Sequence, residues 1–157
     1  MWDRVTLVHL QHAAKTGLAA ALAFYLSRFI HLPESYWAAI SAIIVMYSDL
    51  SQTLKASGDR IIGTAIGVTI GGAFAAQFGE NIWAFAIAVT ITVFICGLLG
   101  FADAARLAGV AVAIVMLATH EGRPWTVPLH RFIEVAFGIV IAVLVSAVKW
   151  PARGSAT

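Results

Sequence analysis

The sequence predicts an all-α integral membrane protein with six transmembrane helices, arranged as two inverted three-helix repeats. Three observations predict this fold: the apolar composition, six apolar runs separated by turn residues, and a second half that repeats the order of apolar runs and connectors in the first. Of the 157 residues, 61% are hydrophobic and 11% are charged, whereas soluble domains average roughly 45–50% and about 25%. A soluble protein of this size could not hide so many apolar side chains from water. The apolar runs lack the alternation of barrel strands, so helices are expected to satisfy the backbone in lipid.

The first segments of the chain are an amphipathic lead-in and an apolar span. Residues 1–11 carry Trp2, Val5 and Val8 at intervals of three, which is typical of a surface helix. The first span is expected over residues 12–30. It ends at the turn His31–Ser35, where a proline disfavours helix in the residue before it.

The second span is expected over residues 36–48, which gives about 20 Å of helix at 1.5 Å per residue. A full crossing needs roughly 20 residues, so this span is short unless it continues as a polar-faced helix through Leu54. Asp49 interrupts the apolar run. The sequence Ser57-Gly58-Asp59 is expected to break and restart the helix.

The remaining spans follow the same hydropathy pattern. The third is expected over residues 61–77 and carries Gly63, Gly67 and Gly71, which lie on one helix face and let another backbone approach closely. The other three spans are expected over residues 82–99, 107–119 and 132–148, and the fifth is again short. The tail, residues 151–157, is polar and expected to be disordered.

The distribution of basic residues predicts that both termini lie on the inner side of the membrane, because inner segments carry the excess of Lys and Arg. The inner segments contain Arg4, Lys15, Lys55, Arg60, Arg106, Lys149 and Arg153, and the outer segments contain Arg28, Arg123 and Arg131.

The two halves, residues 12–77 and 82–150, align with each other. A shift of 70 places Ile44-Val45-Met46 on Ile114-Val115-Met116. A shift of 71 places Arg60 on Arg131 and Gly67 on Gly138, so the small-residue face is kept. Three spans per half force opposite orientations, which is the usual architecture of secondary transporters. The matched short second and fifth spans indicate a substrate site near the midplane.

A Tyr-Trp opening, a polar connector and an Arg-x-x-Gly-Thr-x-x-Gly motif resemble the fusaric acid resistance (FUSC) or aromatic acid exporter family. The residues that carry the resemblance are Tyr36, Trp37, Arg60, Gly63, Thr64 and Gly67. The similarity covers one six-helix membrane module, residues 13–150. It implies export of aromatic carboxylic acids and similar organic anions across the bacterial inner membrane. Larger members carry soluble domains and often two modules, so this chain is expected to act as a homodimer or to lack full transport activity.

Arg60 and Arg131 are the main candidates for substrate binding. Each is expected to open its helix, where a permanent charge and free backbone N–H groups both attract carboxylates. The alternative is that both arginines simply extend to the headgroups at span ends. Tyr36 and Trp37 are candidates for stacking on an aromatic ring, and the alternative is a place in the interfacial aromatic belt.

Two carboxylates are candidates for carrying a coupling proton. Asp49 either serves this role beside a broken helix or caps an inner helix. Glu134 either forms a local ion pair with Arg131, three residues earlier, or relays protons coupled to that arginine.

The motifs of enzymes do not occur in the sequence. His120-Glu121 is not followed by the second histidine of a zinc site, because Pro124 stands there. We therefore expect no enzyme, cofactor, metal site or nucleic-acid partner. The alternatives to an exporter are a passive anion channel and a structural membrane subunit that transports nothing.

Overall fold

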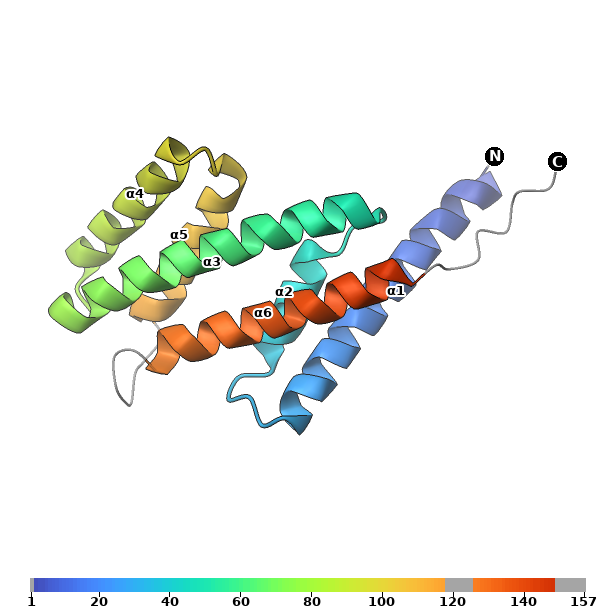
Figure 1. Ribbon diagram of the computed structural model, residues 1–157, viewed down its shortest axis with the longest axis horizontal. Helices are drawn as coiled ribbons and strands as arrows, with labels where there is room; N and C mark the ends of the chain where they lie inside the picture. Colours follow the sequence, from blue (N-terminus) through green and yellow to red (C-terminus); the bar gives the residue numbers. More distant parts are fainter. Residues whose placement is uncertain (1, 118–125, 149–157) are drawn as a thin grey trace.

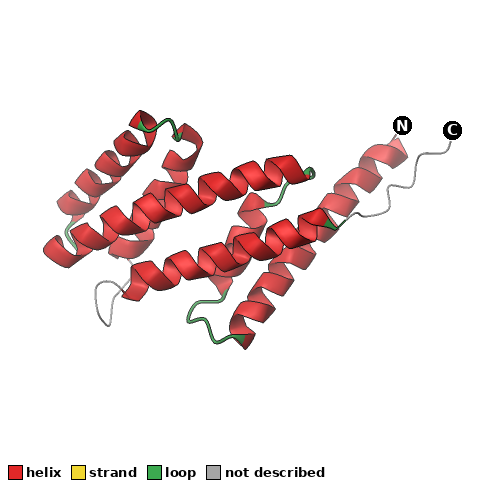
Figure 2. Ribbon diagram, in the orientation of Figure 1, coloured by secondary structure: helices red, strands yellow, loops and turns green. Residues whose placement is uncertain are grey.

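The computed structural model describes residues 2–117 and 126–148, and the secondary structure in this part of the chain is entirely helical (Figure 2). It contains six helices, which confirms the all-α prediction of six. The predicted tail, residues 151–157, lies outside the described residues. The helices are α1 (Trp2–Phe29), α2 (Tyr36–Val45), α3 (Leu50–Phe78), α4 (Ile82–Leu98), α5 (Ala102–Leu117) and α6 (Thr126–Ala147).

The two helices α3 and α6 form the middle of the molecule, where they lie side by side and run in opposite directions (Figure 1). The pair α1 and α2 packs against α6, and the pair α4 and α5 packs against α3. The helices α2 and α5 are about 15 and 24 Å long at 1.5 Å per residue, and α3 is about 44 Å. Each short helix therefore packs on a long one, α2 on α6 and α5 on α3.

Glycines set the closest helix approaches. A Cβ added to Gly63 would lie 2.6 Å from the backbone oxygen of Ala104, and one added to Gly67 would overlap the backbone oxygen of Ala108. On α6, a Cβ added to Gly138 would overlap the backbone oxygen of Ala38 on α2. The crossings of α3 with α5 and of α6 with α2 thus bring the backbones themselves into contact.

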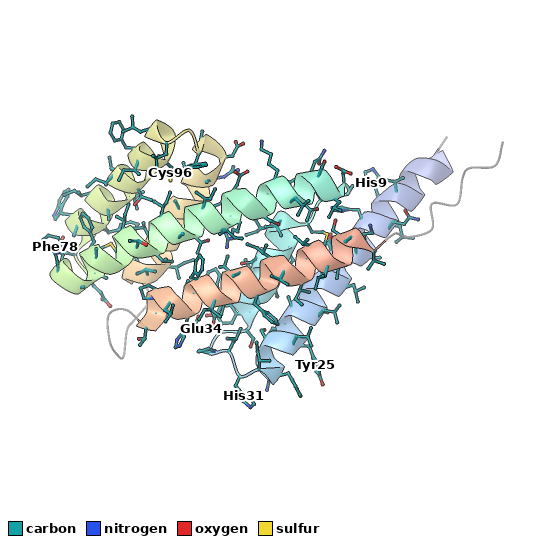
Figure 3. The ribbon with its side chains drawn as sticks, viewed as in Figure 1. His9, Tyr25, His31, Glu34, Phe78 and Cys96 are labelled. Atoms are coloured by element: carbon teal, nitrogen blue, oxygen red, sulfur yellow. The ribbon has the colours of Figure 1, made fainter. Side chains whose placement is uncertain are left out.

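Large apolar side chains cover the outside of the bundle. On α4, Trp83 is 77% exposed and Leu98 is 70% exposed, and Figure 3 shows Tyr25 pointing away from the end of α1. Both α3 and α6 are long and apolar enough to cross a membrane, and α2 and α4 are shorter apolar helices. An apolar surface of this extent fits lipid better than water.

The predicted helix break at Ser57-Gly58-Asp59 is wrong, because α3 runs unbroken through it. The hydroxyl of Ser57 donates to the backbone oxygen of Thr53 at 2.7 Å, within the helix. A glycine inside a helix costs only about 1 kcal/mol, and packing of α3 on α5 and α6 outweighs that cost. Similarly, α1 is one continuous helix that includes the amphipathic segment.

Candidate functional site

A cluster of three charged side chains joins the α1–α2 loop to α6. Arg131 donates from Nη2 to Oε2 of Glu34 at 2.6 Å and from Nη1 to Oε2 of Glu134 at 3.2 Å. The backbone N–H of Glu34 donates to Oε1 of Glu134 at 2.7 Å. Figure 3 shows Glu34 in the loop beside α6. One cation therefore meets two carboxylates, and the ionised cluster has a net charge of −1.

Two aromatic residues at the start of α2 complete the surroundings of Glu34. The indole Nε1 of Trp37 donates to Oε2 of Glu34 at 3.0 Å, and the hydroxyl of Tyr36 donates to the same oxygen. The guanidinium of Arg131 lies over the Trp37 ring, 4.5 Å from its centroid, at cation–π distance. Donors from three side chains thus converge on one carboxylate oxygen.

The members of the cluster differ in exposure. The side chains of Arg131 and Glu134 are 5% and 1% exposed, whereas that of Glu34 is 40% exposed. Burial alone would raise the pKa of Glu34, but the hydrogen bonds from Tyr36 and Arg131 and the charge of Arg131 together lower this pKa below its ordinary value of 4.5. Glu34 is therefore ionised at neutral pH and is the carboxylate with access to water.

Arg60, on α3, is a second buried cation, and none of the described residues forms an ion pair with it. It is 3% exposed, and its Nε lacks a hydrogen-bond partner. Across residues 2–117 and 126–148, no side chain or backbone group accepts a hydrogen bond from its guanidinium. An isolated charge removed from water costs several kcal/mol. The environment of Arg60 therefore favours binding of an anion.

Three adjoining cavities surround these residues, and we name each after one lining residue. The Glu34 cavity has a volume of about 500 Å³ and the Lys55 cavity of about 350 Å³. Between them, the Arg60 cavity has only about 10 Å³, roughly the room for one water. The Arg60 cavity shares Trp37, Ile114 and Arg131 with the Glu34 cavity and Leu107 with the Lys55 cavity. The Glu34 cavity and the Lys55 cavity thus meet at the narrow Arg60 cavity, which forms a constriction between them.

The prediction that Arg60 and Arg131 open their helices is wrong. Arg60 lies about 15 Å along α3 from Leu50 at 1.5 Å per residue, and Arg131 lies more than one turn inside α6, which includes Thr126. Arg60 is internal because α3 begins at Leu50, in the connector before the predicted third span. Free N–H groups therefore do not assist these arginines, and their side-chain charge is what they offer an anion.

Asp49 is the N-cap of α3, where its carboxylate accepts a hydrogen bond from the backbone N–H of Ser51 at 3.1 Å. A hydrogen bond from the Ser51 side chain is the main cause that lowers the pKa of Asp49 below 3.8. The side chain is exposed and lines none of the three cavities named above. The structure therefore places Asp49 away from the arginines.

The other predicted residues come together in part. Arg60, Arg131 and Trp37 line the Arg60 cavity, and Tyr36 lines the adjoining Glu34 cavity. The local ion pair between Glu134 and Arg131 is present. The glycines, in contrast, lie at helix crossings: Gly71 on α3 would place a Cβ 3.1 Å from the Cα of Val112 on α5.

Glu34 is the residue that sequence reasoning missed. It stands after Pro33 in a turn, where a carboxylate has no helical or strand periodicity to identify it. Its partners on α6 lie 97 and 100 residues away in the sequence. The one available signal was a lone carboxylate two residues before the Tyr36-Trp37 pair.

Comparison with known proteins gives one family and several relatives. The sequence profile described as "Fusaric acid resistance protein-like" matches residues 19–145. The uncharacterized transporter YdhK of Escherichia coli K12 is 26% identical over 149 residues, which cover 88% of this chain and 22% of YdhK. A UPF0421 protein of Bacillus cereus (strain ATCC 14579) is 25% identical over 137 residues, which cover 87% of this chain and 38% of that protein. A UPF0421 protein of Halalkalibacterium halodurans is 27% identical over 139 residues, which cover 88% of this chain and 39% of that protein.

The chain thus spans about a fifth of YdhK and less than two fifths of the UPF0421 proteins. No solved structure matches the chain. The family match and the exposed apolar surface together identify a membrane protein.

Proposed function

The chain belongs to the fusaric acid resistance protein-like family, and on that premise we propose that it is a membrane transporter that exports small organic anions, with aromatic carboxylic acids as the substrate class. YdhK is named as a transporter, which supports the first part of this proposal. The anionic substrate and the outward direction rest on the chemistry of the site and on the family description.

The observation that carries the proposal is the position of Arg60. A buried guanidinium with no partner in the described part of the chain stands at the constriction between two cavities that together have room for a small organic acid. An anion that reaches Arg60 from either cavity supplies the counter-charge that Arg60 lacks among the described residues. This arrangement favours anions over neutral solutes and cations.

The aromatic residues give the site its preference for a ring. We assign the carboxylate to Arg131 and Arg60, and the ring to Trp37 and Tyr36. One face of the Trp37 ring is covered by Arg131, so the substrate contacts the other face or the edge. The Glu34 cavity also offers apolar side chains from α5, including Ile114 and Leu117, against which a benzene ring packs favourably.

Proton coupling is assigned to Glu134 in preference to Asp49. Glu134 is buried against Arg131, so a proton on Glu134 changes the charge that the substrate meets. Asp49 is exposed and caps α3, and it acts only as an entry point for protons in this proposal. A proton gradient would then drive export through the charge state of the Arg131 cluster.

We propose further that the two halves are inverted repeats, with the N- and C-termini both on the inner side. The helix crossings support the repeat. The shift of 71 relates Gly67 to Gly138. The shift of 70, which applies to the second and fifth helices, relates Ala38 to Ala108. In both crossings the glycine faces the backbone oxygen of that alanine. Equivalent pairs of helices, α3 with α5 and α6 with α2, therefore meet across the two halves.

The setting we propose is the bacterial inner membrane, which the bacterial relatives support. We also propose a homodimer, because Tyr36 and Leu117 are 49% and 52% exposed at the edge of the Glu34 cavity and a second copy would cover them. Native mass spectrometry of the protein released from detergent would detect the dimer, and a monomer alone would contradict it.

The test of the proposed function is uptake of labelled benzoate into proteoliposomes, with and without a pH gradient. Wild type is compared with Arg60→Ala and with Arg28→Ala, a control that removes an exposed arginine of α1. We expect gradient-dependent uptake in wild type and Arg28→Ala and a loss of at least tenfold in Arg60→Ala. Uptake that ignores the pH gradient would indicate a passive channel, and no uptake by folded wild type would contradict transport.

A further inference from the structure

We propose that Glu34 is a built-in occupant of the anion site and that a substrate carboxylate must displace it. This inference rests on the proposed function, because it concerns regulation of the same site. The residues that we assign to an aromatic carboxylate already hold a carboxylate, and that carboxylate belongs to the chain itself.

The donors around Glu34 match what a foreign carboxylate requires. The Arg131 guanidinium, the Trp37 indole and the Tyr36 hydroxyl all donate to Oε2 of Glu34. A charged donor and two aromatic side chains are the groups that recognise an aromatic acid. In the present conformation those donors are directed at Glu34, so an incoming acid competes with it directly.

Charge makes the competition strict. With Glu34 in place, Arg131 is already matched by two carboxylates, so Arg131 offers a further anion no uncompensated charge. Once Glu34 leaves, Arg131 retains only Glu134, and a substrate carboxylate restores the original balance. Binding at Arg131 therefore proceeds by exchange of one carboxylate for another.

The structure also indicates which carboxylate leaves. Glu134 is 1% exposed and belongs to the same helix as Arg131, whereas the Glu34 side chain is 40% exposed on a loop. The backbone N–H of Glu34 holds Oε1 of Glu134, and this bond does not involve the Glu34 side chain. Rotation of that side chain into water opens the site while the loop stays in place.

The first experiment measures benzoate affinity by isothermal titration at pH 7 on the purified, detergent-solubilised protein. Glu34→Gln keeps the size and an acceptor oxygen but removes the competing charge, and Glu80→Gln is the matched control at an exposed glutamate of the α3–α4 turn. We expect Glu34→Gln to bind benzoate on the order of tenfold more tightly, because benzoate no longer has to displace a charged side chain from Arg131. Glu80→Gln should equal wild type.

The outcomes separate this inference from the function beneath it. Benzoate that binds wild type and Glu34→Gln with equal affinity, or the variant more weakly, overturns the occupant role and leaves transport intact. Benzoate that binds neither protein, with no uptake in proteoliposomes, overturns both.

A second measurement uses wild type and so does not depend on folding of the variant. A water-soluble carbodiimide with an amine modifies accessible carboxylates, and mass spectrometry of the peptide that contains Glu34 reports its reactivity. Benzenesulfonate, an aromatic anion without a carboxylate, is added at a concentration that displaces bound benzoate. We expect modification of Glu34 to rise severalfold while Glu80 is unchanged. A reactivity of Glu34 that stays constant or falls overturns the inference.

Discussion

Arg131 Nη2 lies 2.6 Å from Glu34 Oε2, although 97 residues separate them in the chain. This ion pair fastens the loop before α2 to the second turn of α6. It also holds the Glu34 side chain in the lining of the Glu34 cavity, beside Tyr36 and Trp37. The stability of the protein should therefore depend on the charge of Glu34.

The first prediction concerns acid. The pKa of Glu34 is lowered below 4.5 in the folded protein, so its contribution is complete at neutral pH and is lost as the pH falls through that lowered pKa. Wild type should lose stability relative to Glu34→Gln between about pH 5 and pH 3, because the unfolded pKa is about 4.3. Thermal unfolding of both proteins in detergent across this range measures the difference. A difference in Tm that is constant with pH would contradict the prediction.

The second prediction separates stability from function at Arg60. Arg60→Met replaces a buried charge that has no partner among residues 2–117 and 126–148 with an apolar side chain of similar length, and we expect the folded state to gain about 1 kcal/mol or more. The same change should abolish benzoate binding. Thermal unfolding and titration calorimetry measure the two effects, and Arg28→Met, at an exposed site, is the control. A fall in Tm for Arg60→Met would mean that the charge has a stabilising partner.

The third prediction concerns the crossing of α3 and α5. Gly67→Ala places a methyl group against the backbone of Ala108 and should destabilise the protein by about 1–3 kcal/mol. Gly58→Ala lies in the same helix with no atom within 4 Å of the new methyl group, and it should stabilise by about 1 kcal/mol. Thermal unfolding of the two variants in parallel measures the opposite signs. Equal shifts would mean that the crossing is looser than described.

The fourth prediction compares two ion pairs in different environments. The Lys55–Asp103 pair is 3.1 Å long with side chains 73% and 70% exposed, so Lys55→Met should leave the stability nearly unchanged. Arg131→Met leaves Glu134 buried without a counter-charge and should cost about 3–5 kcal/mol. Thermal unfolding of both variants should therefore rank them clearly. Similar losses in the two would contradict the role assigned to burial.

Much of the fold could be predicted from hydropathy, because apolar runs of sufficient length in an apolar chain leave helices as the main solution. The helix ends could not. Ser57, Gly58 and Asp59 have weak helix propensity, but packing of α3 against its neighbours overrides it. For the same reason, Arg60 lies well inside a helix that the sequence suggested would begin beside it.

The candidate site was predictable only where it followed a local pattern. The pair of Arg131 and Glu134 follows from a spacing of three residues within one helix. The role of Glu34 depends on contacts across most of the chain, and no local pattern encodes such contacts. The absence of a partner for Arg60 among the described residues is likewise a property of the packed bundle.

The packing of α3 on α5 and of α6 on α2 has a consequence for biosynthesis. Each of these crossings joins two helices that are not consecutive in the chain. The ribosome therefore synthesises α3 before α5, the helix that covers the glycine face of α3. Until α5 is inserted, that face lacks the α5 backbone against which it packs in the complete bundle. A nascent chain that stops after α4 therefore lacks its tightest backbone contacts. Quality-control proteases would see an incomplete bundle until the last helix is in place.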